Sequence, residues 1–217
     1  MSRRVAVLAS GSGSNLQALL EAELSPAKIV LVIANVEGAG ALARADAAGV
    51  PSHCVPHAGK ERIQFEDELL AVLEPAGVDL VVLAGFMRLL SPHFLDRYPD
   101  AVLNVHPSLL PAFPGVDAQA QAFEAGVRVA GCTVHLVDAG MDTGPILAQA
   151  AVPVTDQDDA ESLRLRILAE EHRLLPRVVQ CIARHGLDLE GPRPRLVLPP
   201  QDPGQALVSP QAWDPTP

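Results

Sequence analysis

The sequence predicts an α/β protein built on a doubly wound, mostly parallel sheet. Short runs rich in Val and Leu alternate with Ala- and Leu-rich stretches of helical length, which is the pattern of βαβ units. The run Val5–Ala9 contains no polar residue, as expected of a strand that is buried on both faces. Near the C-terminal end, two such runs follow each other without a helix between them, so one of them is expected to be antiparallel.

The first half of the chain alternates regularly between strand and helix patterns. A turn at Gly11–Ser14 separates the first strand from the first helix, and Gly49 and Pro51 are expected to end the second helix. In order, the expected elements are the strand Val5–Ala9, the helix Asn15–Ala22, the strand Lys28–Ile33, the helix Ala39–Ala48, the strand His53–Val55, the amphipathic helix Arg62–Leu73 and the strand Leu80–Leu83.

The second half contains the two consecutive strands and a long final helix. Ser91 is expected to cap a short helix, because its hydroxyl can accept from the first backbone N–H groups and Pro92 is tolerated in a first turn. In order, the expected elements are the helix Pro92–Tyr98, the strand Val102–Val105, the helix Ala118–Ala125 ended by Gly126, the strands Ala130–Val137 and Ile146–Val154, and the helix Ala160–Ala183 between a cap at Asp158 or Asp159 and a stop at Gly186.

Length and composition indicate one domain followed by a tail. The chain has 217 residues, of which 48% are hydrophobic, enough for one packed domain, and we assign residues 1–187 to it. Eight of the 20 prolines lie in Gly191–Pro217. Residues 188–217 are therefore predicted to be a proline-rich C-terminal tail with little independent fold.

Charge and aromatic content argue against nucleic-acid and membrane partners. Sixteen Lys and Arg stand against 26 Asp and Glu, a formal net charge of −10 that repels polyanions on average. Aromatic residues make up only 3%, whereas single-stranded nucleic acids bind on aromatic platforms. No apolar run approaches a membrane span, and the first run does not resemble a signal peptide. With three widely spaced cysteines and no CxxC pair, we expect a cytoplasmic protein that acts on small molecules.

A glycine-rich turn, Ser10–Asn15, joins the first strand to the first helix. Ligands of an open α/β sheet bind beyond the carboxyl ends of its strands. Here Gly13 permits close approach, while Ser14, Asn15 and the N–H groups of the helix start can donate to a phosphate. Leu16 replaces the third glycine of a dinucleotide fingerprint, and no P-loop lysine follows. A mononucleotide-like phosphate is therefore favoured, and a tight turn without a ligand remains the alternative.

Asn104 and His106 close a predicted buried strand just before Pro107. Residues i and i+2 of a strand point to the same side, so these two side chains project together. An amide can hold a developing oxyanion while an imidazole polarises it or delivers a proton, which suits acyl transfer. Ordinary turn residues at a strand end remain the alternative.

A loop rich in glycine and carboxylate, Val137–Pro145, follows the next strand. Asp142 is expected to orient His106 and to accept the proton that an attacking amine must lose; a capping aspartate in a turn is the alternative. Asp138 is a turn residue or a ligand contact, and we interpret His135 as a packed strand histidine. Neither EF-hand spacing nor a His pair of metal-binding spacing occurs, so no metal is expected.

Several segments, in this order, resemble the phosphoribosylglycinamide formyltransferase family. They are Leu8–Leu20, Leu80–Pro92, Asn104–Gly115, Gly131–Val154 and Glu170–Pro176, within a resemblance that runs from Arg4 to Leu187. The resemblance implies the formyltransferase fold, a Rossmann-like sheet. It also implies transfer of a formyl group from 10-formyltetrahydrofolate to the amine of 5-phosphoribosylglycinamide in purine biosynthesis. It is compatible with a homodimer.

The resemblance also implies roles for individual residues. Asn104, His106 and Asp142 match the catalytic residues. The residues that match substrate contacts are Gly13, Ser14 and Asn15 of the phosphate loop and Glu171 near the glycinamide. The residues that match folate contacts are Arg62, Met87, Arg88, Leu89, Leu90, Asp138, Ala139, Gly140 and Met141. Apolar side chains directly after a buried strand also suit a pterin ring, although packing under a loop is the alternative for Leu89 and Leu90.

Two departures and three alternatives accompany the resemblance, and the first departure is that the proline-rich tail after Leu187 has no match in the family. Many relatives carry a histidine where Asp117 stands, and an acid cannot supply the same cationic donor, which puts an accessory substrate contact there in doubt. A formyltetrahydrofolate hydrolase is expected to carry an N-terminal regulatory domain for which the sequence leaves no room. A methionyl-tRNA formyltransferase is expected to have a further C-terminal domain and a basic surface. The third alternative is a catalytically silent folate- or nucleotide-binding protein, against which the intact Asn104, His106 and Asp142 argue.

Overall fold

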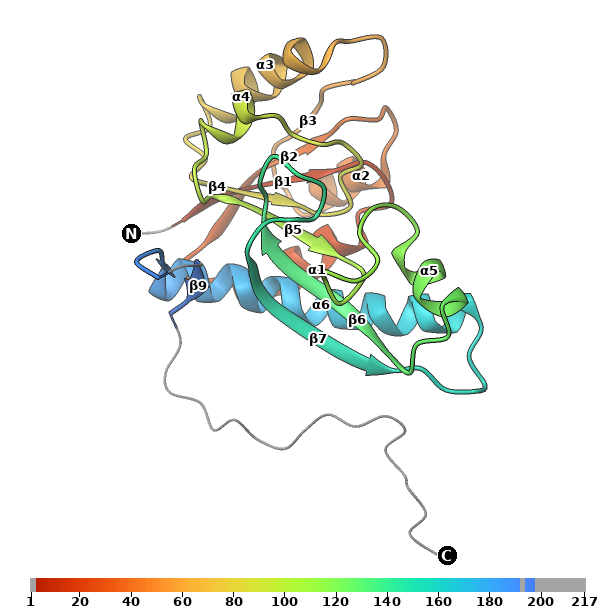
Figure 1. The fold of residues 1–217 in the computed structure, drawn as a ribbon. Coiled ribbons are helices and arrows are strands. Elements are labelled where there is room, and N and C mark those ends of the chain that lie inside the picture. Colours follow the sequence, from red (N-terminus) through yellow and green to blue (C-terminus); the bar gives the residue numbers. More distant parts are fainter. Residues whose placement is uncertain (1–2, 192–193, 198–217) are drawn as a thin grey trace, which may run out of the picture.

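The computed structural model describes residues 3–191 and 194–197, in which seven strands form one sheet in the order β3-β2-β1-β4-β5-β6-β7 (Figure 1). The strands are β1 (Arg4–Ala9), β2 (Lys28–Ala34), β3 (Ser52–Cys54), β4 (Leu80–Leu83), β5 (Val102–His106), β6 (Val129–Leu136) and β7 (Ile146–Pro153). Strands β3, β2, β1, β4 and β5 pair in parallel, whereas β6 is antiparallel to both β5 and β7. The predicted mostly parallel sheet with an antiparallel element is confirmed, and β6 is that element.

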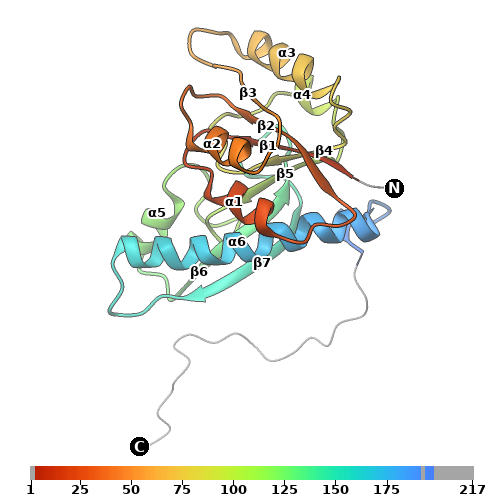
Figure 2. The ribbon, with the colours of Figure 1, turned by 180° about the vertical axis from the view of Figure 1, so that it is seen from behind.

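Helices cover both faces of the sheet. One face carries α1 (Ser14–Glu21), α2 (Gly40–Ala47) and α6 (Ala160–His185), which lie in front in Figure 2. The other face carries α3 (Arg62–Leu73) and α4 (Pro92–Leu95), while α5 (Ala118–Glu124) packs against α6. Strand β1 shows why both faces are covered. Val5 and Val7 pack toward α1 and α6, Ala6 and Leu8 pack toward α3, and all four are fully buried.

Two helix ends differ in how well the sequence predicted them. The cap Asp159 and the stop Gly186 of α6 are confirmed, and Asp159 forms a capping box with Ser162. Ser91 precedes α4 as predicted, but its side chain does not cap the helix, because its hydroxyl donates to the buried carboxylate of Glu66. The predicted end at Tyr98 was three residues too far, since the backbone after Leu95 tightens into turns with i−3 hydrogen bonds.

A short antiparallel hairpin follows α6. Strand β8 (Leu187–Asp188) pairs with β9 (Arg195–Leu196), and Leu187 and Leu196 pack against the core beneath α6. The hairpin lies across the predicted boundary between the domain, residues 1–187, and the tail, residues 188–217, and this boundary stays a prediction. Most of the predicted tail lies outside the described residues. Within residues 3–191 and 194–197, no helix combines the length and apolar character of a membrane span.

Candidate active site

The strand pair β5–β6 directs four polar side chains to one face of the sheet. In its antiparallel register, Asn104 lies opposite His135, and His106 lies opposite Thr133. Successive side chains of a strand point to opposite faces. The apolar residues that alternate with these four pack instead in the core beneath α6: Leu103, Val105, Val134 and Leu136.

The loop after β6 brings the Asp142 carboxylate to His106. Asp142 Oδ2 lies 3.4 Å from His106 Nδ1 and accepts a hydrogen bond of 2.8 Å from the N–H of Gly115. His106 Nε2 lies 2.8 Å from the carbonyl oxygen of Phe113, so this nitrogen donates. Both ring nitrogens therefore face acceptors, and a doubly protonated ring would donate to each of them.

His135 contacts both Asn104 and Asp142 of the predicted trio. Its Nδ1 lies 2.8 Å from the carbonyl oxygen of Leu136, so Nδ1 carries the proton. Burial of the ring lowers the pKa of His135, which keeps the ring neutral and leaves Nε2 as an acceptor. This Nε2 lies 3.1 Å from Asn104 Nδ2 and 3.7 Å from Asp142 Oδ1. The interpretation of His135 as a packed strand histidine was therefore incomplete.

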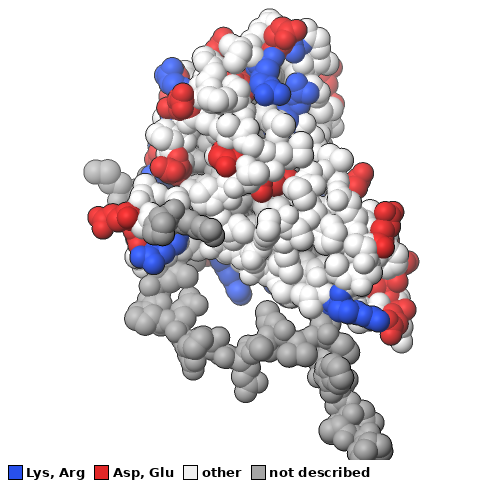
Figure 3. Space-filling view, viewed as in Figure 1, with Lys and Arg blue, Asp and Glu red and all other residues white. Residues whose placement is uncertain are grey.

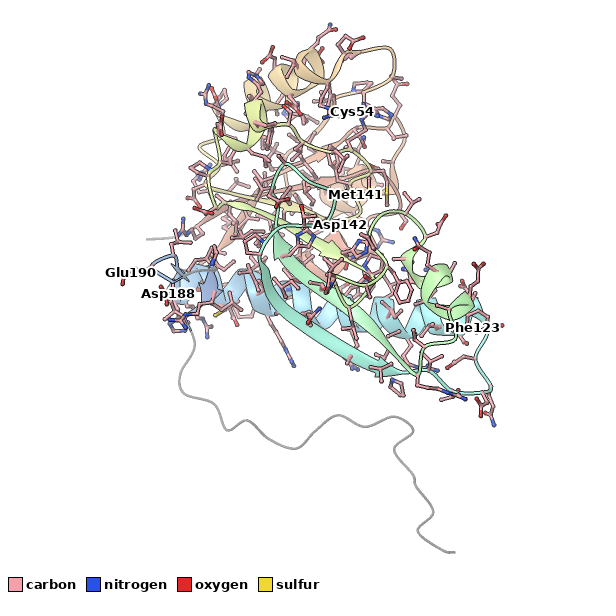
Figure 4. The ribbon with its side chains drawn as sticks, in the orientation of Figure 1. Cys54, Phe123, Met141, Asp142, Asp188 and Glu190 are labelled. Carbon is pink, nitrogen blue, oxygen red and sulfur yellow. The ribbon has the colours of Figure 1, made fainter. Side chains whose placement is uncertain are left out.

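A tight loop holds Asp142 in an unusual backbone conformation. Its φ is 55°, in the left-handed region that side-chain-bearing residues seldom adopt. Asp138 Oδ1 braces the loop by accepting from the N–H of Gly140 (3.0 Å) and from the Thr143 hydroxyl (2.7 Å). A Cβ at Gly140 would lie 2.0 Å from Thr143 Oγ1, so this turn needs a glycine. Figure 4 shows Met141 and Asp142 beside each other on this loop.

A cavity of about 420 Å³ opens over these side chains. Its walls include Asn104, His106, His135 and Asp142, together with these residues predicted to contact folate: Met87, Arg88, Leu89, Leu90, Asp138, Gly140 and Met141. Met87 and Met141 are exposed at 70% and 51%, whereas Leu90 is buried. Asp117 also lines the cavity. Across the middle of this face, apart from a few acidic side chains, the surface is largely uncharged (Figure 3).

Two predicted folate contacts are not among the residues that line this cavity. Arg62 is exposed at the start of α3, and Ala139 is exposed within the Asp138–Asp142 loop. The role of each in folate binding stays a prediction.

The glycine-rich turn lies beside this cavity at the carboxyl edge of the sheet. Gly13 is the N-cap of α1 with φ 75°, and Ser14 and Asn15 form the first turn of the helix. Ser10 ties the turn to the cavity wall, because its hydroxyl accepts from the Met87 N–H (2.8 Å) and its own N–H donates to the Gly85 carbonyl oxygen (3.0 Å). The phosphate loop predicted after β1 thus adjoins the cavity at the ends of β4 and β5.

Asn15 and Glu171 form a buried polar pair beside this turn. Asn15 Nδ2 donates to Glu171 Oε2 at 2.7 Å, and both side chains are more than nine-tenths buried. Burial raises the pKa of Glu171. Within the described residues, Asn15 Oδ1 and Glu171 Oε1 have no hydrogen-bond partner, so both oxygens can accept from a ligand.

Sequence reasoning gave His135 only a packing role and did not consider Thr133, which lies opposite His106 on β6. Their period-two spacing on β6 was visible in the sequence, but the antiparallel register that sets them opposite Asn104 and His106 comes from the structure. No group of three or more His, Cys, Asp or Glu side chains in the described part of the chain could hold a metal ion.

Comparison with known proteins shows the family of the chain. The formyl transferase family model matches residues 3–179. The chain belongs to the formyl transferase family. A phosphoribosylglycinamide formyltransferase of Mycobacterium tuberculosis is 48% identical over 191 residues, covering 87% of this chain and 88% of the relative. The crystal structure of glycinamide ribonucleotide transformylase 1 from Symbiobacterium toebii is 49% identical, with a TM-score of 0.86, covering 90% of this chain and 94% of the other.

Another relative of the formyl transferase family is much longer. The trifunctional purine biosynthetic protein adenosine-3 of Drosophila melanogaster is 49% identical over 186 residues, which cover 83% of this chain but only 14% of that protein. The predicted fold, the resemblance to phosphoribosylglycinamide formyltransferases and the enzyme class, a formyltransferase, are confirmed by these matches.

Proposed function

We propose that the chain transfers the formyl group of 10-formyltetrahydrofolate to the amine of 5-phosphoribosylglycinamide, a step of purine biosynthesis. The observation that carries this proposal is the convergence of Asn104, His106 and Asp142 on one cavity. The proposal is supported by relatives that are named for this reaction.

The cavity residues suit a flat, partly apolar ring with polar edges. Met87, Leu89 and Met141 offer exposed apolar surface, while the Asp138–Asp142 loop offers polar backbone groups. In this proposal, these residues bind 10-formyltetrahydrofolate so that its formyl carbon lies near Asn104 and His106. The formyl group comes from this bound co-substrate.

The acceptor enters from the side of the phosphate loop. The N–H groups around Gly13, Ser14 and Asn15 at the start of α1 hold its phosphate, since a helix N-terminus favours an anion. The unpaired oxygens of Asn15 and Glu171 accept from the N–H or O–H groups of the acceptor. Because β1 pairs with β4, and β4 with β5, this arrangement directs the acceptor amine toward the cavity.

Three side chains, Asn104, His106 and Asp142, have separate roles in the formyl transfer. The Asn104 amide donates to the formyl oxygen, on which negative charge develops as the amine attacks. The N–H at His106 Nδ1, which lies 3.4 Å from Asp142 Oδ2, is shared between that carboxylate and the formyl oxygen. Asp142 stabilises the charged His106 ring and takes the proton from the attacking nitrogen, either directly or through a water molecule. The tetrahedral intermediate then collapses: the bond between the formyl carbon and the folate nitrogen breaks, and that nitrogen takes up the proton as tetrahydrofolate leaves. Holding two small substrates in register contributes up to about 7–11 kcal/mol in favourable cases, and one oxyanion donor about 3 kcal/mol.

One assay tests this proposal against its alternatives. Purified protein is mixed with 10-formyltetrahydrofolate, and tetrahydrofolate release is followed with and without 5-phosphoribosylglycinamide. Release that depends on the acceptor supports the transferase, whereas equal release without it indicates a formyltetrahydrofolate hydrolase. No release in either case indicates a silent binding protein. Cytoplasmic location and a homodimer stay predictions.

A further inference from the structure

We propose that Arg44, on α2, is a positioning residue for the phosphate-binding turn: it fixes the peptide plane whose N–H points toward the acceptor's phosphate. The inference rests on the proposed function, in which this turn receives the phosphate. Arg44 is partly buried, and it lies outside the cavity and outside every segment that carried the family resemblance.

Helix α2 holds the turn through two consecutive carbonyl groups. The Ala41 N–H donates to the Gly11 carbonyl oxygen at 3.2 Å, and Arg44 Nε donates to the Ser12 carbonyl oxygen at 2.8 Å. In a trans peptide, the C=O of one residue and the N–H of the next point in opposite directions. With both carbonyls turned toward α2, the N–H groups of Ser12 and Gly13 point away from it.

The contact between the turn and α2 leaves no room for a side chain at Gly13 or Gly40. A Cβ at Gly13 would lie 2.7 Å from Ala41 Cα, and a Cβ at Gly40 would lie 2.9 Å from the Ser12 carbonyl oxygen. Within the described residues, no protein oxygen accepts from the N–H groups of Ser12 or Gly13. Successive N–H groups that point to the same side form a concavity that binds anions.

Arg44 also connects the turn to the helix that follows it. Its Nη1 donates to Gln17 Oε1 at 3.0 Å, and the Gln17 N–H donates to the Gly13 carbonyl oxygen at 2.9 Å. One guanidinium group on α2 therefore fixes both the residue before Gly13 and the start of α1, and the two helices lie side by side in Figure 2. Its positive charge also favours an anion at this turn in a chain of net charge −10.

The variants R44Q and R44K test this role, with R97Q as the matched control. Among the described residues, Arg97 is an arginine held by a single side chain, Glu74, as Arg44 is by Gln17, but it follows α4 on the other face of the sheet, away from the turn. For each variant, we would measure kcat, the KM for each substrate, and the Kd for inorganic phosphate by calorimetry. Thermal unfolding would establish that each variant is folded.

We expect R44Q to raise the KM for the glycinamide acceptor and the Kd for inorganic phosphate by about tenfold, the effect of losing one charged hydrogen bond. The KM for the formyl donor and the kcat should stay as in the wild type. R44K keeps the charge but lacks the Nε–Nη fork, so it should fall between R44Q and the wild type. R97Q should match the wild type throughout.

Two results would overturn the role of Arg44. One is an R44Q protein whose acceptor KM and phosphate Kd equal those of the wild type. The other is an equal rise in KM for an acceptor that lacks the phosphate, which would indicate a general structural effect. If the wild type itself shows no acceptor-dependent release, the proposed function fails, and the inorganic phosphate titration still decides the role of Arg44.

Discussion

The side-chain amide of Asn104 lies 3.1 Å from Nε2 of His135, directly across the β5–β6 pair. Because His135 Nδ1–H donates to the Leu136 carbonyl oxygen, Nε2 is an acceptor and Asn104 must turn its NH₂ group toward it. One N–H of that amide remains to donate elsewhere. His135 thus sets the direction of the amide that, in the proposed mechanism, faces the formyl oxygen.

The first prediction concerns this orientation. In H135L, the Asn104 amide loses its acceptor, so kcat should fall by about 10- to 100-fold while both KM values change little. H135Q retains an acceptor oxygen and should recover part of the loss. Steady-state kinetics at neutral pH measure both effects. Equal kcat values for H135L and the wild type would show that Asn104 needs no such partner.

The second prediction concerns the Asp142 carboxylate. D142N retains an oxygen to accept from the Gly115 N–H but can neither take a proton nor stabilise a charged His106 ring. We expect kcat to fall by about 10²- to 10⁴-fold, with thermal unfolding close to that of the wild type. The matched control is D156N, since Asp156 is an exposed aspartate paired with Arg128. Wild-type turnover by D142N would refute the proposed role of Asp142.

The sheet and most helices were predictable because each depends on local pattern. The run Val5–Ala9 has no polar residue because both faces of β1 are covered, and Asp159 caps α6 through residues only three apart. The contact of His135 with Asn104 was not predictable, since it depends on the register between β5 and β6, which residues 107–128 separate along the chain. The prediction that the Ser91 side chain caps α4 was wrong for a similar reason, because its hydrogen-bond partner, Glu66, comes from another helix.

The third prediction uses the buried charge of Glu171. Burial raises its pKa, so the folded state holds the proton more tightly than the unfolded state does. Below the pKa of the carboxyl group in the unfolded chain, Glu171 makes its full contribution to the stability of the folded state. This contribution is lost as the pH rises through the higher pKa of the folded state. Above that value the wild type carries an unfavourable buried charge that E171Q cannot carry, while the glutamine oxygen still accepts from Asn15.

We expect E171Q to gain stability relative to the wild type as the pH rises, so that at pH 7.5 it unfolds at a higher temperature than the wild type. The difference should shrink toward zero as the pH falls to about 4. The same variant should raise the KM for the acceptor, because a ligand donor loses a charged acceptor. Calorimetric scans across this pH range measure the first effect. An E171Q protein less stable than the wild type at pH 7.5 would contradict the argument.

The fourth prediction concerns Thr133, a buried hydroxyl beneath the segment that contacts His106. Thr133 Oγ1 donates to the Ser108 carbonyl oxygen (2.7 Å) and accepts from the Leu110 N–H (3.0 Å). A few residues further on, the same segment supplies the Phe113 carbonyl to His106. T133V keeps the shape but leaves these buried groups without partners, at a cost of about 1–3 kcal/mol each.

T133V should therefore lower the free energy of unfolding and reduce kcat by about tenfold at a temperature where the protein is folded. T133S, which retains the hydroxyl, should preserve kcat. Urea unfolding measures the first effect, and hydrogen exchange at residues 108–115 shows whether the segment has loosened. The prediction is contradicted if T133V loses stability but has the kcat of T133S. In that case Thr133 contributes only to the packing of β6, and residues 108–115 hold the Phe113 carbonyl at His106 without it.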